Sequence, residues 1–526
     1  MTNSPERPIV RNCLSLESAV KTNFAHYLRL FAMPYLFLRI LFLSRSVVFA
    51  GSRFLAGLLF LLFVNSISAQ TNMPGKQALP VPTAQQLAWH DTEFYLFFHF
   101  GPNTFTNVEW GHGTEPEDIF NPTDLDCDQW CQVAKQAGAR GVVITAKHHD
   151  GFCLWPSQYS KHTVRESKWR DGKGDVLREL SEACRRHGLK FGVYMSPWDR
   201  NHPQYGTPEY NDVYVNTLTE LLTGYGELFE IWWDGANGEG PNGKKQVYDF
   251  HRFEQVAARL QPNAVIFSDI GPGCRWVGNE RGLILSETNW CTLDTAGFQR
   301  GLGAPSNDTL NRGNENGAHW IPAECDVSIR PGWFYHAEED DKVKTPEQLW
   351  DIYLHSVGRG ANLILNVPPD RRGRIHEQDS LSLVAFGEKV GTAFQYNLAK
   401  GRKIYQRSIC AFTPRKRFSY MLDGDRNTYE KIQLPNLDPV NLQIDLCKKR
   451  TFNAVVIREA IAEGQLIQSF SVEVWKNDGW QEVARSTTIG ARKILRFPEQ
   501  KARKIRIVIR VSKGEPALSE VEVYKI

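Results

Sequence analysis

The chain has 526 residues, and aromatic residues make up 12% of them, including 15 tryptophans. This composition excludes a fully disordered chain, and the length predicts two or three globular units. The formal net charge is only +3, from 62 basic and 59 acidic side chains. We therefore expect no nucleic-acid partner, because such a surface needs many lysine and arginine contacts to phosphates.

Residues 1–69 differ from the rest of the sequence, because long apolar stretches alternate there with mostly basic residues. Arg53 precedes the charge-free apolar run 54–64, and a few small residues follow it, which is typical of a signal peptide. We expect this leader to be removed and the mature protein to be exported to the periplasm, the cell surface or the medium. A membrane anchor is the alternative, but Arg39, Arg45 and Arg53 interrupt the run that a spanning helix requires.

Strand-like and helix-like segments alternate after the leader. Apolar segments rich in β-branched and aromatic residues predict strands at 95–100, 141–146, 190–195, 228–233 and 264–268. The apolar spacing between them predicts helices at 125–137, 175–187, 210–225 and 247–260. A helix at 346–356 and a strand at 362–367 continue the series, whereas 271–344 is rich in loops. This alternation indicates parallel strands, in either an open doubly wound sheet or a (β/α)8 barrel.

Two features favour the barrel, for residues 70–397. No G-x-G-x-x-G pattern follows the first strand, so the nucleotide-binding fingerprint of an open sheet is absent. Barrel enzymes also build their active sites from residues at the carboxyl ends of the strands. Here, side chains capable of chemistry directly follow successive strands: His99, then His148, His149 and Asp150, then Ser196 and Asp199, and then Asp234.

Residues 398–526 show short strands with alternating apolar and polar side chains. The apolar positions are Phe470, Val472 and Val474, then Ile505, Ile507, Ile509 and Val511, and finally Val521 and Val523. This pattern predicts an antiparallel β-sandwich whose core these side chains face. The predicted fold class is therefore α/β, with a (β/α)8-like barrel followed by an antiparallel β-sandwich domain.

Asp234 is the first candidate for a catalytic residue. It ends a predicted strand after two tryptophans and precedes Gly235, so its carboxyl group can face a substrate; the alternative is an Asp-Gly turn. Hydrolysis of a glycosidic bond needs a second carboxyl group that donates a proton. Glu280 and Glu287 are the candidates. We prefer Glu280, which lies in a Gly-rich loop beside a tryptophan, where partial burial favours a protonated carboxyl group.

The adjacent residues His148 and His149 suggest two kinds of site. They could be metal ligands, but neighbouring strand residues point to opposite faces, so joint chelation requires the strand to end between them. The helical H-E-x-x-H spacing of a zinc enzyme is also missing. We prefer neutral imidazoles that form hydrogen bonds with sugar hydroxyl groups.

Several ordered motifs together resemble the α-L-fucosidases of glycoside hydrolase family 29. They are Phe-His-Phe-Gly at 98–101, Ala-Lys-His-His-Asp-Gly-Phe at 146–152, Trp155, Tyr194 before Ser196, and Trp-Trp-Asp at 232–234. The resemblance implies a retaining double displacement, with Asp234 as nucleophile and Glu280 as acid/base, Glu287 being the second choice for that role. Retention further requires that the two carboxyl groups lie about 5 Å apart.

The same resemblance implies a set of substrate-binding residues. Those that match fucose-binding positions of the family, or lie in a later matching loop, are His99, Trp110, His148, His149, Tyr194, Trp232, Arg330 and Trp333. Segments 275–280 and 324–334 look like the subfamily that prefers α-1,3 and α-1,4 fucosyl branches. No metal and no organic cofactor is expected for catalysis, because two carboxyl groups suffice.

The C-terminal domain resembles the discoidin-like carbohydrate-binding sandwiches of family 32, at 469–480 and 518–524. Such sandwiches can hold a structural calcium ion, for which Asp423, Asp425 and Asn427 are the candidate ligands. Their spacing also suits an ordinary Asx turn, which is the alternative.

The leading hypothesis is an exported α-L-fucosidase that acts on fucosylated oligosaccharides or glycoconjugate glycans. One alternative is a catalytically inactive carbohydrate-binding protein, which needs no second carboxyl group near Asp234. The other alternative is a metal-dependent barrel hydrolase that uses His99, His148 and Asp150.

Overall fold

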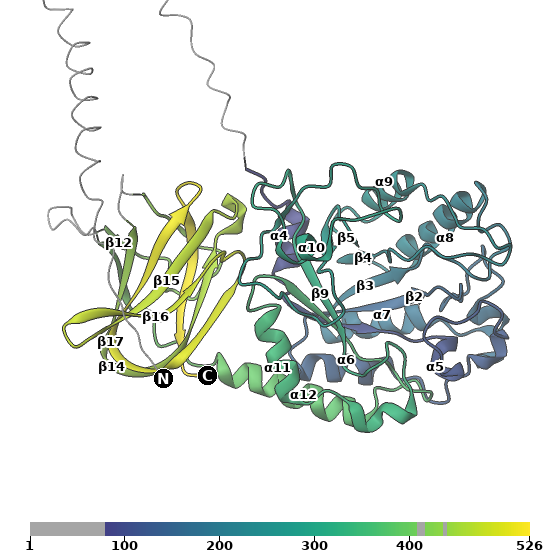
Figure 1. Ribbon diagram of the computed structural model, residues 1–526. Helices are drawn as coiled ribbons and strands as arrows, with labels where there is room; N and C mark the ends of the chain where they lie inside the picture. The colour runs from purple at the N-terminus through teal and green to yellow at the C-terminus, as the bar shows by residue number, and fades with distance from the viewer. Residues whose placement is uncertain (1–78, 408–415, 435–438) are drawn as a thin grey trace, which may run out of the picture. The chain divides into compact units, whose positions relative to one another are not determined.

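The computed structural model describes residues 79–407, 416–434 and 439–526, and the predicted leader 1–69 lies outside them. Eight parallel strands form a closed barrel in the order β1-β10-β9-β6-β5-β4-β3-β2. Figure 1 shows these strands in blue to green with the helices around them. The strands are β1 Phe94–Phe98, β2 Gly141–Lys147, β3 Lys190–Met195, β4 Glu230–Trp232, β5 Val265–Ser268, β6 Cys274–Trp276, β9 Ala323–Ser328 and β10 Asn362–Asn366. This arrangement confirms the predicted barrel.

Most of the helices cover the outside of the barrel, whereas α4 contributes Trp89 to the cluster of side chains inside it. The helices are α4 Ala84–His90, α5 Pro102–Thr106, α6 Cys127–Gln136, α7 Val176–His187, α8 Tyr210–Gly224, α9 Phe250–Leu260, α10 Asn307–Arg312, α11 Pro346–His355 and α12 Glu377–Ala393. None of the helices in the described ranges is long and apolar enough to cross a bilayer. The ends of α7 show how local sequence sets the limits of a helix. The Asp175 side chain accepts a hydrogen bond from the Arg178 amide at the start, and Gly188, with φ 63°, ends the helix.

The barrel strands are buried on both faces, as expected for a parallel sheet covered by helices. In β1, Tyr95 and Phe97 point into the barrel, whereas Phe94, Leu96 and Phe98 pack in the layer between strands and helices. This alternation explains why the strand is apolar along its whole length.

The barrel departs from a regular repeat in the segment 271–344, which the sequence pattern indicates to be rich in loops. Strand β6 follows β5 directly, with no helix between them, and β9 comes after a long excursion. That excursion contains α10 and the small antiparallel pair of β7 Thr292–Leu293 and β8 His319–Trp320. The short β6 and the polar sequence of β9 hide both strands from a search for apolar runs.

The C-terminal residues form an antiparallel sandwich-like domain, drawn in yellow-green in Figure 1. Its strands are β11 Lys403–Arg407, β12 Lys416–Phe418, β13 Glu430–Lys431, β14 Val440–Glu459, β15 Ile467–Lys476, β16 Gly479–Ser486, β17 Lys493–Ser512 and β18 Ala517–Tyr524. The predicted core positions are buried with one exception, because Val511 is 50% exposed. The pairing of β15 with β17 shifts register next to Val511 and turns its side chain away from the core.

The candidate calcium ligands lie in consecutive turns of this domain. Asp423 Oδ1 accepts a hydrogen bond from the Asp425 amide at 2.8 Å, and Asp425 Oδ1 accepts one from the Asn427 amide at 3.0 Å. The Thr428 hydroxyl donates to the other Asp423 oxygen at 2.8 Å. These are the contacts of Asx turns, and calcium binding there stays a prediction.

Glu93, just before β1, connects the barrel to the sandwich. Its carboxylate accepts hydrogen bonds from Arg458 and Arg492 of the sandwich, each at 2.9 Å. Burial opposes the ionisation of Glu93, but Arg458, Arg492, Arg426 and Arg140 outweigh it and hold the pKa of this carboxyl group well below its usual value.

We predict that Glu93→Gln lowers the free energy of unfolding by about 3 to 5 kcal/mol at pH 7, because it leaves two buried guanidinium groups without a carboxylate. The folded pKa is depressed, so the contribution is fully present above the unfolded pKa of about 4.5 and declines progressively as the pH falls from there toward the folded pKa. Urea unfolding of both proteins between pH 7 and pH 3 measures the difference. The exposed Glu499→Gln, which removes a pair with Lys525, is the control and should cost less than about 1 kcal/mol. Equal losses in the two variants would contradict the prediction.

Candidate active site

A cavity of about 200 Å³ opens at the carboxyl ends of the barrel strands. This volume is below the range of pockets that hold drug-sized ligands, so it suits a single sugar ring. Side chains from or after β1, β2, β3, β4, β6 and β9 contribute to it. Its lining residues are Phe97, His99, Glu109, Trp110, His148, His149, Tyr194, Trp232, Asp234, Ala236, Glu280, Asp326 and Trp333.

Asp234 lies just after β4 with its side chain 27% exposed to the cavity. Its Oδ1 accepts a hydrogen bond from the Ala236 amide at 2.7 Å, and its Oδ2 accepts one from the Tyr194 hydroxyl at 3.2 Å. The His149 ring nitrogen Nε2 lies 3.7 Å from the same Oδ2. These contacts fix the carboxylate at one place in the cavity wall.

Close packing explains why a glycine follows Asp234 at position 235. A Cβ atom built at Gly235 would lie only 2.0 Å from Oδ2 of Asp269. Burial, and then the nearby charge of Asp234, raise the pKa of Asp269 to about 6. Glycine at this position therefore allows a second carboxyl group to lie close behind Asp234, so the Asp-Gly pair does more than start a turn.

The histidines of the cavity are neutral. Burial lowers the pKa of His99 to about 3, and burial, followed by the neighbouring His149, His99 and Lys147, lowers the pKa of His148 well below its usual value. Burial also lowers the pKa of His149, against the opposing charge of Asp234. Neutral rings match the predicted role of hydrogen-bond partners for hydroxyl groups.

Asn366 fixes the tautomer of His99. Its amide NH2 donates to the Trp333 carbonyl at 2.7 Å, so its carbonyl oxygen faces His99 Nδ1 at 2.9 Å. Nδ1 must therefore donate, which leaves the Nε2 lone pair of His99 free to accept from a ligand hydroxyl. His148 also lines the cavity, and its buried Nδ1 has no hydrogen-bond partner among the described residues.

Glu280 follows β6 and lines the same cavity as Asp234. The structure thus brings together the two carboxyl groups that the sequence selects. Asp326 on β9 is a third carboxyl group, which the sequence analysis does not identify. Trp276 donates its indole N–H to Asp326 at 2.9 Å, and burial and then the charge of Glu280 raise the pKa of Asp326 well above its usual value.

Glu287, the second choice for the acid/base, does not reach the cavity. It lies between barrel and sandwich, where it accepts hydrogen bonds from Arg359 at 2.6 Å and Ser486 at 2.8 Å and pairs with Lys493 at 3.4 Å. The structure therefore places Glu287 at the domain junction and Glu280 in the cavity with Asp234.

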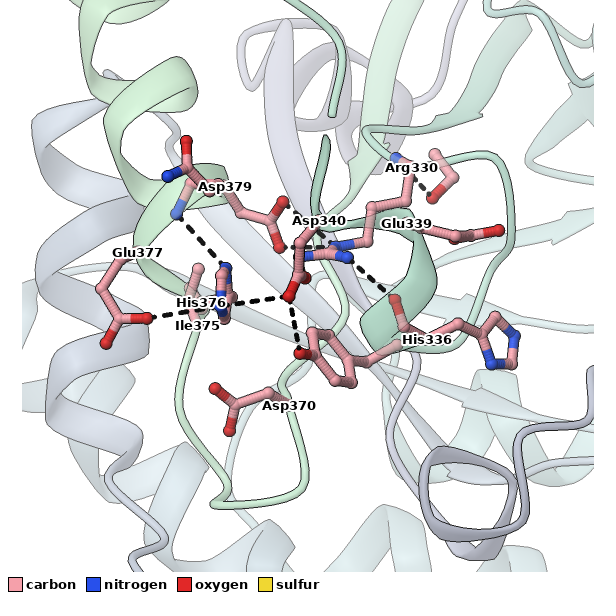
Figure 2. A network of polar contacts seen from close by, with 12 residues as sticks. Arg330, His336, Glu339, Asp340, Asp370, Ile375, His376, Glu377 and Asp379 are labelled. Atoms are coloured by element: carbon pink, nitrogen blue, oxygen red, sulfur yellow. Dashed lines mark hydrogen bonds and ion pairs between the residues drawn. The ribbon is translucent and has the colours of Figure 1, made fainter. Parts of the chain in front are cut away.

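Arg330, predicted to bind substrate, is also placed elsewhere. Its guanidinium group is fully buried and pairs with Asp379 and Asp340, each at 2.9 Å, as Figure 2 shows. The pair with Asp379 ties the loop after β9 to the first turn of α12, and the pair with Asp340 lies within that loop. Arg330 therefore anchors the loop that carries Trp333, whose ring lines the cavity.

Glu109 is a cavity residue that the sequence analysis passes over, although it precedes Trp110. Its carboxylate accepts a hydrogen bond from the Trp333 amide at 2.8 Å and contacts the His336 ring nitrogen at 2.5 Å. It thereby joins the loop that carries Trp110 to the loop that carries Trp333. Trp110 itself is 55% exposed at the rim.

The metal-dependent alternative finds no support in this arrangement. Asp150 is absent from the cavity lining, and one of its oxygens accepts a hydrogen bond from the Phe152 amide at 2.7 Å. Within residues 79–407, 416–434 and 439–526, the group whose side-chain atoms are close enough to share a metal ion is Glu230, Cys274 and Glu324. It contains none of the cavity histidines.

Comparisons with known proteins agree with this site. The α-L-fucosidase family model matches residues 68–391, and a NedA-like galactose-binding domain matches residues 420–507. α-L-Fucosidase 1 of Arabidopsis thaliana is 43% identical over 455 residues, which are 85% of this chain and 88% of the plant protein.

Two solved structures show the same fold over 85% of this chain. A glycoside hydrolase 29 family member from an unknown rumen bacterium is 41% identical with a TM-score of 0.74, over 78% of its own chain. A Ruminococcus gnavus family 29 fucosidase in complex with fucose is 31% identical with a TM-score of 0.75, over 95% of its own chain. Together with the paired carboxyl groups at the barrel rim, these matches establish that the chain belongs to the α-L-fucosidases of glycoside hydrolase family 29.

Proposed function

We propose that this protein is a retaining α-L-fucosidase that removes α-1,3- and α-1,4-linked fucose from the ends of branched glycans. The observation that carries the proposal is the convergence of Asp234 and Glu280 in one cavity of the size of a single sugar ring. A binding protein would not need two such groups, so this pairing favours an enzyme over the carbohydrate-binding alternative.

In the proposed reaction, an Asp234 oxygen attacks the anomeric carbon of the fucose ring. The bond to the leaving oxygen breaks while Glu280 transfers its proton to that oxygen, which gives a fucosyl ester on Asp234. Water then attacks the anomeric carbon, passes a proton to the Glu280 carboxylate and displaces Asp234. Two inversions at one carbon give net retention.

The contacts around Asp234 suit a nucleophile. The Ala236 amide occupies Oδ1, whereas Oδ2 has only the longer Tyr194 hydrogen bond and the distant His149 ring nitrogen. Oδ2 is therefore the atom that we expect to attack. Donation from Tyr194 also stabilises the carboxylate that is released in the second step.

The other cavity walls suit fucose itself. The lone pair on His99 Nε2 can accept from a sugar hydroxyl, and the rings of Trp232 and Trp333 offer apolar surface to the ring carbons and the C5 methyl group. Burial lowers the pKa of all three histidines, which favours the neutral rings that can accept hydrogen bonds from hydroxyl groups.

We predict that Asp234→Ala abolishes hydrolysis of every fucoside. Glu280→Ala should lower the rate on a natural glycan by about 10²- to 10⁴-fold, because it removes proton donation. It should affect an aryl fucoside with an acidic phenol much less, since that leaving group needs little protonation.

Added azide should give the α-fucosyl azide with the Glu280 variant, but the β-azide with the Asp234 variant. Glu287→Gln, at the domain junction, is the matched control and should leave both rates unchanged; a loss there equal to that of Glu280→Ala would contradict the assignment.

Retention predicts the configuration of the first product. Proton NMR during hydrolysis of an aryl α-L-fucoside should show the α anomer of fucose before the β anomer grows by mutarotation. The β anomer as first product would mean inversion, which instead requires carboxyl groups about 6.5 to 9.5 Å apart.

The linkage preference rests on the resemblance of segments 275–280 and 324–334 to the branch-specific subfamily. We predict that a Lewis-type branched trisaccharide loses fucose at least about tenfold faster than 2'-fucosyllactose at equal concentration, a difference of about 1.4 kcal/mol in barrier. Chromatographic measurement of released fucose tests this, with Asp234→Ala as the blank. Equal rates would retain the fucosidase activity and remove the linkage preference.

A further inference from the structure

A polar cluster lies inside the barrel below the cavity, and the proposed reaction does not use it. Glu230 on β4, Cys274 on β6 and Glu324 on β9 are all fully buried, and Tyr95 on β1 completes the group. Barrel interiors are normally filled with branched apolar side chains. Two carboxyl groups in this position therefore require an explanation.

The hydrogen bonds account for nearly every oxygen of the two carboxyl groups. Glu324 accepts from the Trp232 indole N–H at 2.8 Å and from the Tyr95 hydroxyl, and Glu230 accepts from the Trp89 indole N–H at 3.2 Å. Oε2 of Glu230 alone has no such partner among the described residues.

One proton shared by the two glutamates completes this account. Burial, and for Glu230 also the neighbouring Glu324, raise the pKa of both carboxyl groups. Two negative charges are unfavourable side by side in this buried site, and a single proton between the two carboxyl groups lets one glutamate donate to the other.

A metal ion is the competing occupant, because one atom each of Glu230, Cys274 and Glu324 lie within 4.8 Å of one another. Both oxygens of Glu324, however, already accept hydrogen bonds from Trp232 and Tyr95. Because these donors point their positively polarised hydrogens at the same two oxygens, they disfavour a cation there, and the donor set favours the shared proton.

Trp232 links this cluster to the reaction site. Its ring lines the cavity, stacks on Phe267 at 3.9 Å between centroids with 9° between planes, and stacks on Tyr194 at 5.3 Å and 27°. Tyr194 in turn donates to Asp234. The indole N–H bound to Glu324 therefore fixes how the ring lies beneath the sugar and beside the nucleophile's partner.

We propose that Glu324, paired with Glu230, is a positioning residue for fucoside hydrolysis, which it supports by holding the Trp232 indole against the cavity. The proposal rests on the proposed function, because the reaction that it serves is the one at Asp234. Glu324 does not touch the substrate and acts only through Trp232.

The test is a double-mutant cycle in the full protein with an aryl α-L-fucoside. Glu324→Leu should lower kcat/KM by about 10- to 100-fold, because small misplacements of groups at the reaction site are costly. Trp232→Phe removes the N–H that Glu324 holds. In that background Glu324→Leu should have little further effect, and full additivity of the two losses would overturn the proposal.

Two further variants separate positioning from general destabilisation. Glu324→Gln should retain kcat/KM within about threefold, since its amide oxygen can still accept from Trp232, whereas only the hydrogen bond from Tyr95 loses its acceptor. Glu324→Asp shortens the side chain by one methylene group and so withdraws the oxygen from the Trp232 indole. It should therefore lower kcat/KM as Glu324→Leu does, and it serves as the test if Glu324→Leu does not fold. Activity of Glu324→Asp equal to wild type would overturn the proposal.

Glu459 provides the matched control for burial. It is an equally buried glutamate in the sandwich, where it accepts hydrogen bonds from the amides of Leu466, Ile467 and Gly490. Glu459→Leu should lower stability but leave kcat/KM of the folded enzyme unchanged. If Glu459→Leu lowered kcat/KM as much as Glu324→Leu does, the effect of Glu324 would be one of stability alone, and its positioning role would be overturned.

The wild-type enzyme distinguishes failure of this inference from failure of the proposed function. If the wild type hydrolyses no fucoside, the proposed function fails, and calorimetric binding of fucose to the same proteins then tests the positioning role. If the wild type is active and the cycle is additive, only this inference fails. Stoichiometric zinc in the purified active enzyme, measured by mass spectrometry, would overturn the shared proton.

Discussion

Closure of the parallel barrel is the constraint on which the rest of the structure depends. Because all eight strands run in one direction, the residues after their carboxyl ends meet around one rim. Asp234 and Glu280 lie on separate segments after β4 and β6, and neither segment forms a site by itself. The ring of strands must therefore be complete before the cavity exists.

Burial determines the charge of the cavity. It keeps the histidines neutral, and the described lining contains four carboxyl groups but no lysine or arginine. A cavity of this kind offers acceptors to the hydroxyl groups of an uncharged sugar and repels an anionic one. Arg330, the one arginine that the sequence predicts as a binding residue, serves instead as an anchor behind the cavity wall.

The sequence allowed prediction of those parts of the fold that repeat and those site residues that directly follow a regular strand. His99, His148, His149 and Asp234 follow strands whose apolar runs are plain, and all of them line the cavity. Strands β6 and β9 lie in a segment without periodicity, so Asp326 could not be placed.

Residues whose partners are distant in sequence were the hardest to assign. Glu280 and Glu287 both lie in irregular segments near glycine, so the sequence alone cannot decide which of them is the acid/base. The partners that hold Glu287 away from the cavity belong to another domain. Arg330 meets Asp379, 49 positions further along the chain, and no local pattern reveals such a pair. Glu109 can be predicted as a cavity residue, since it is adjacent to Trp110, a predicted binding residue.

The contact at Glu93 also limits how freely the two domains can be exchanged between relatives. Glu93 adopts a left-handed backbone conformation, with φ 55°, which is unfavourable for a residue that has a side chain. Its buried carboxylate takes its hydrogen bonds from Arg458 and Arg492 of the sandwich. A chimera that joins this barrel to a foreign module must therefore supply two guanidinium groups at matching positions. A linker of suitable length would not replace them.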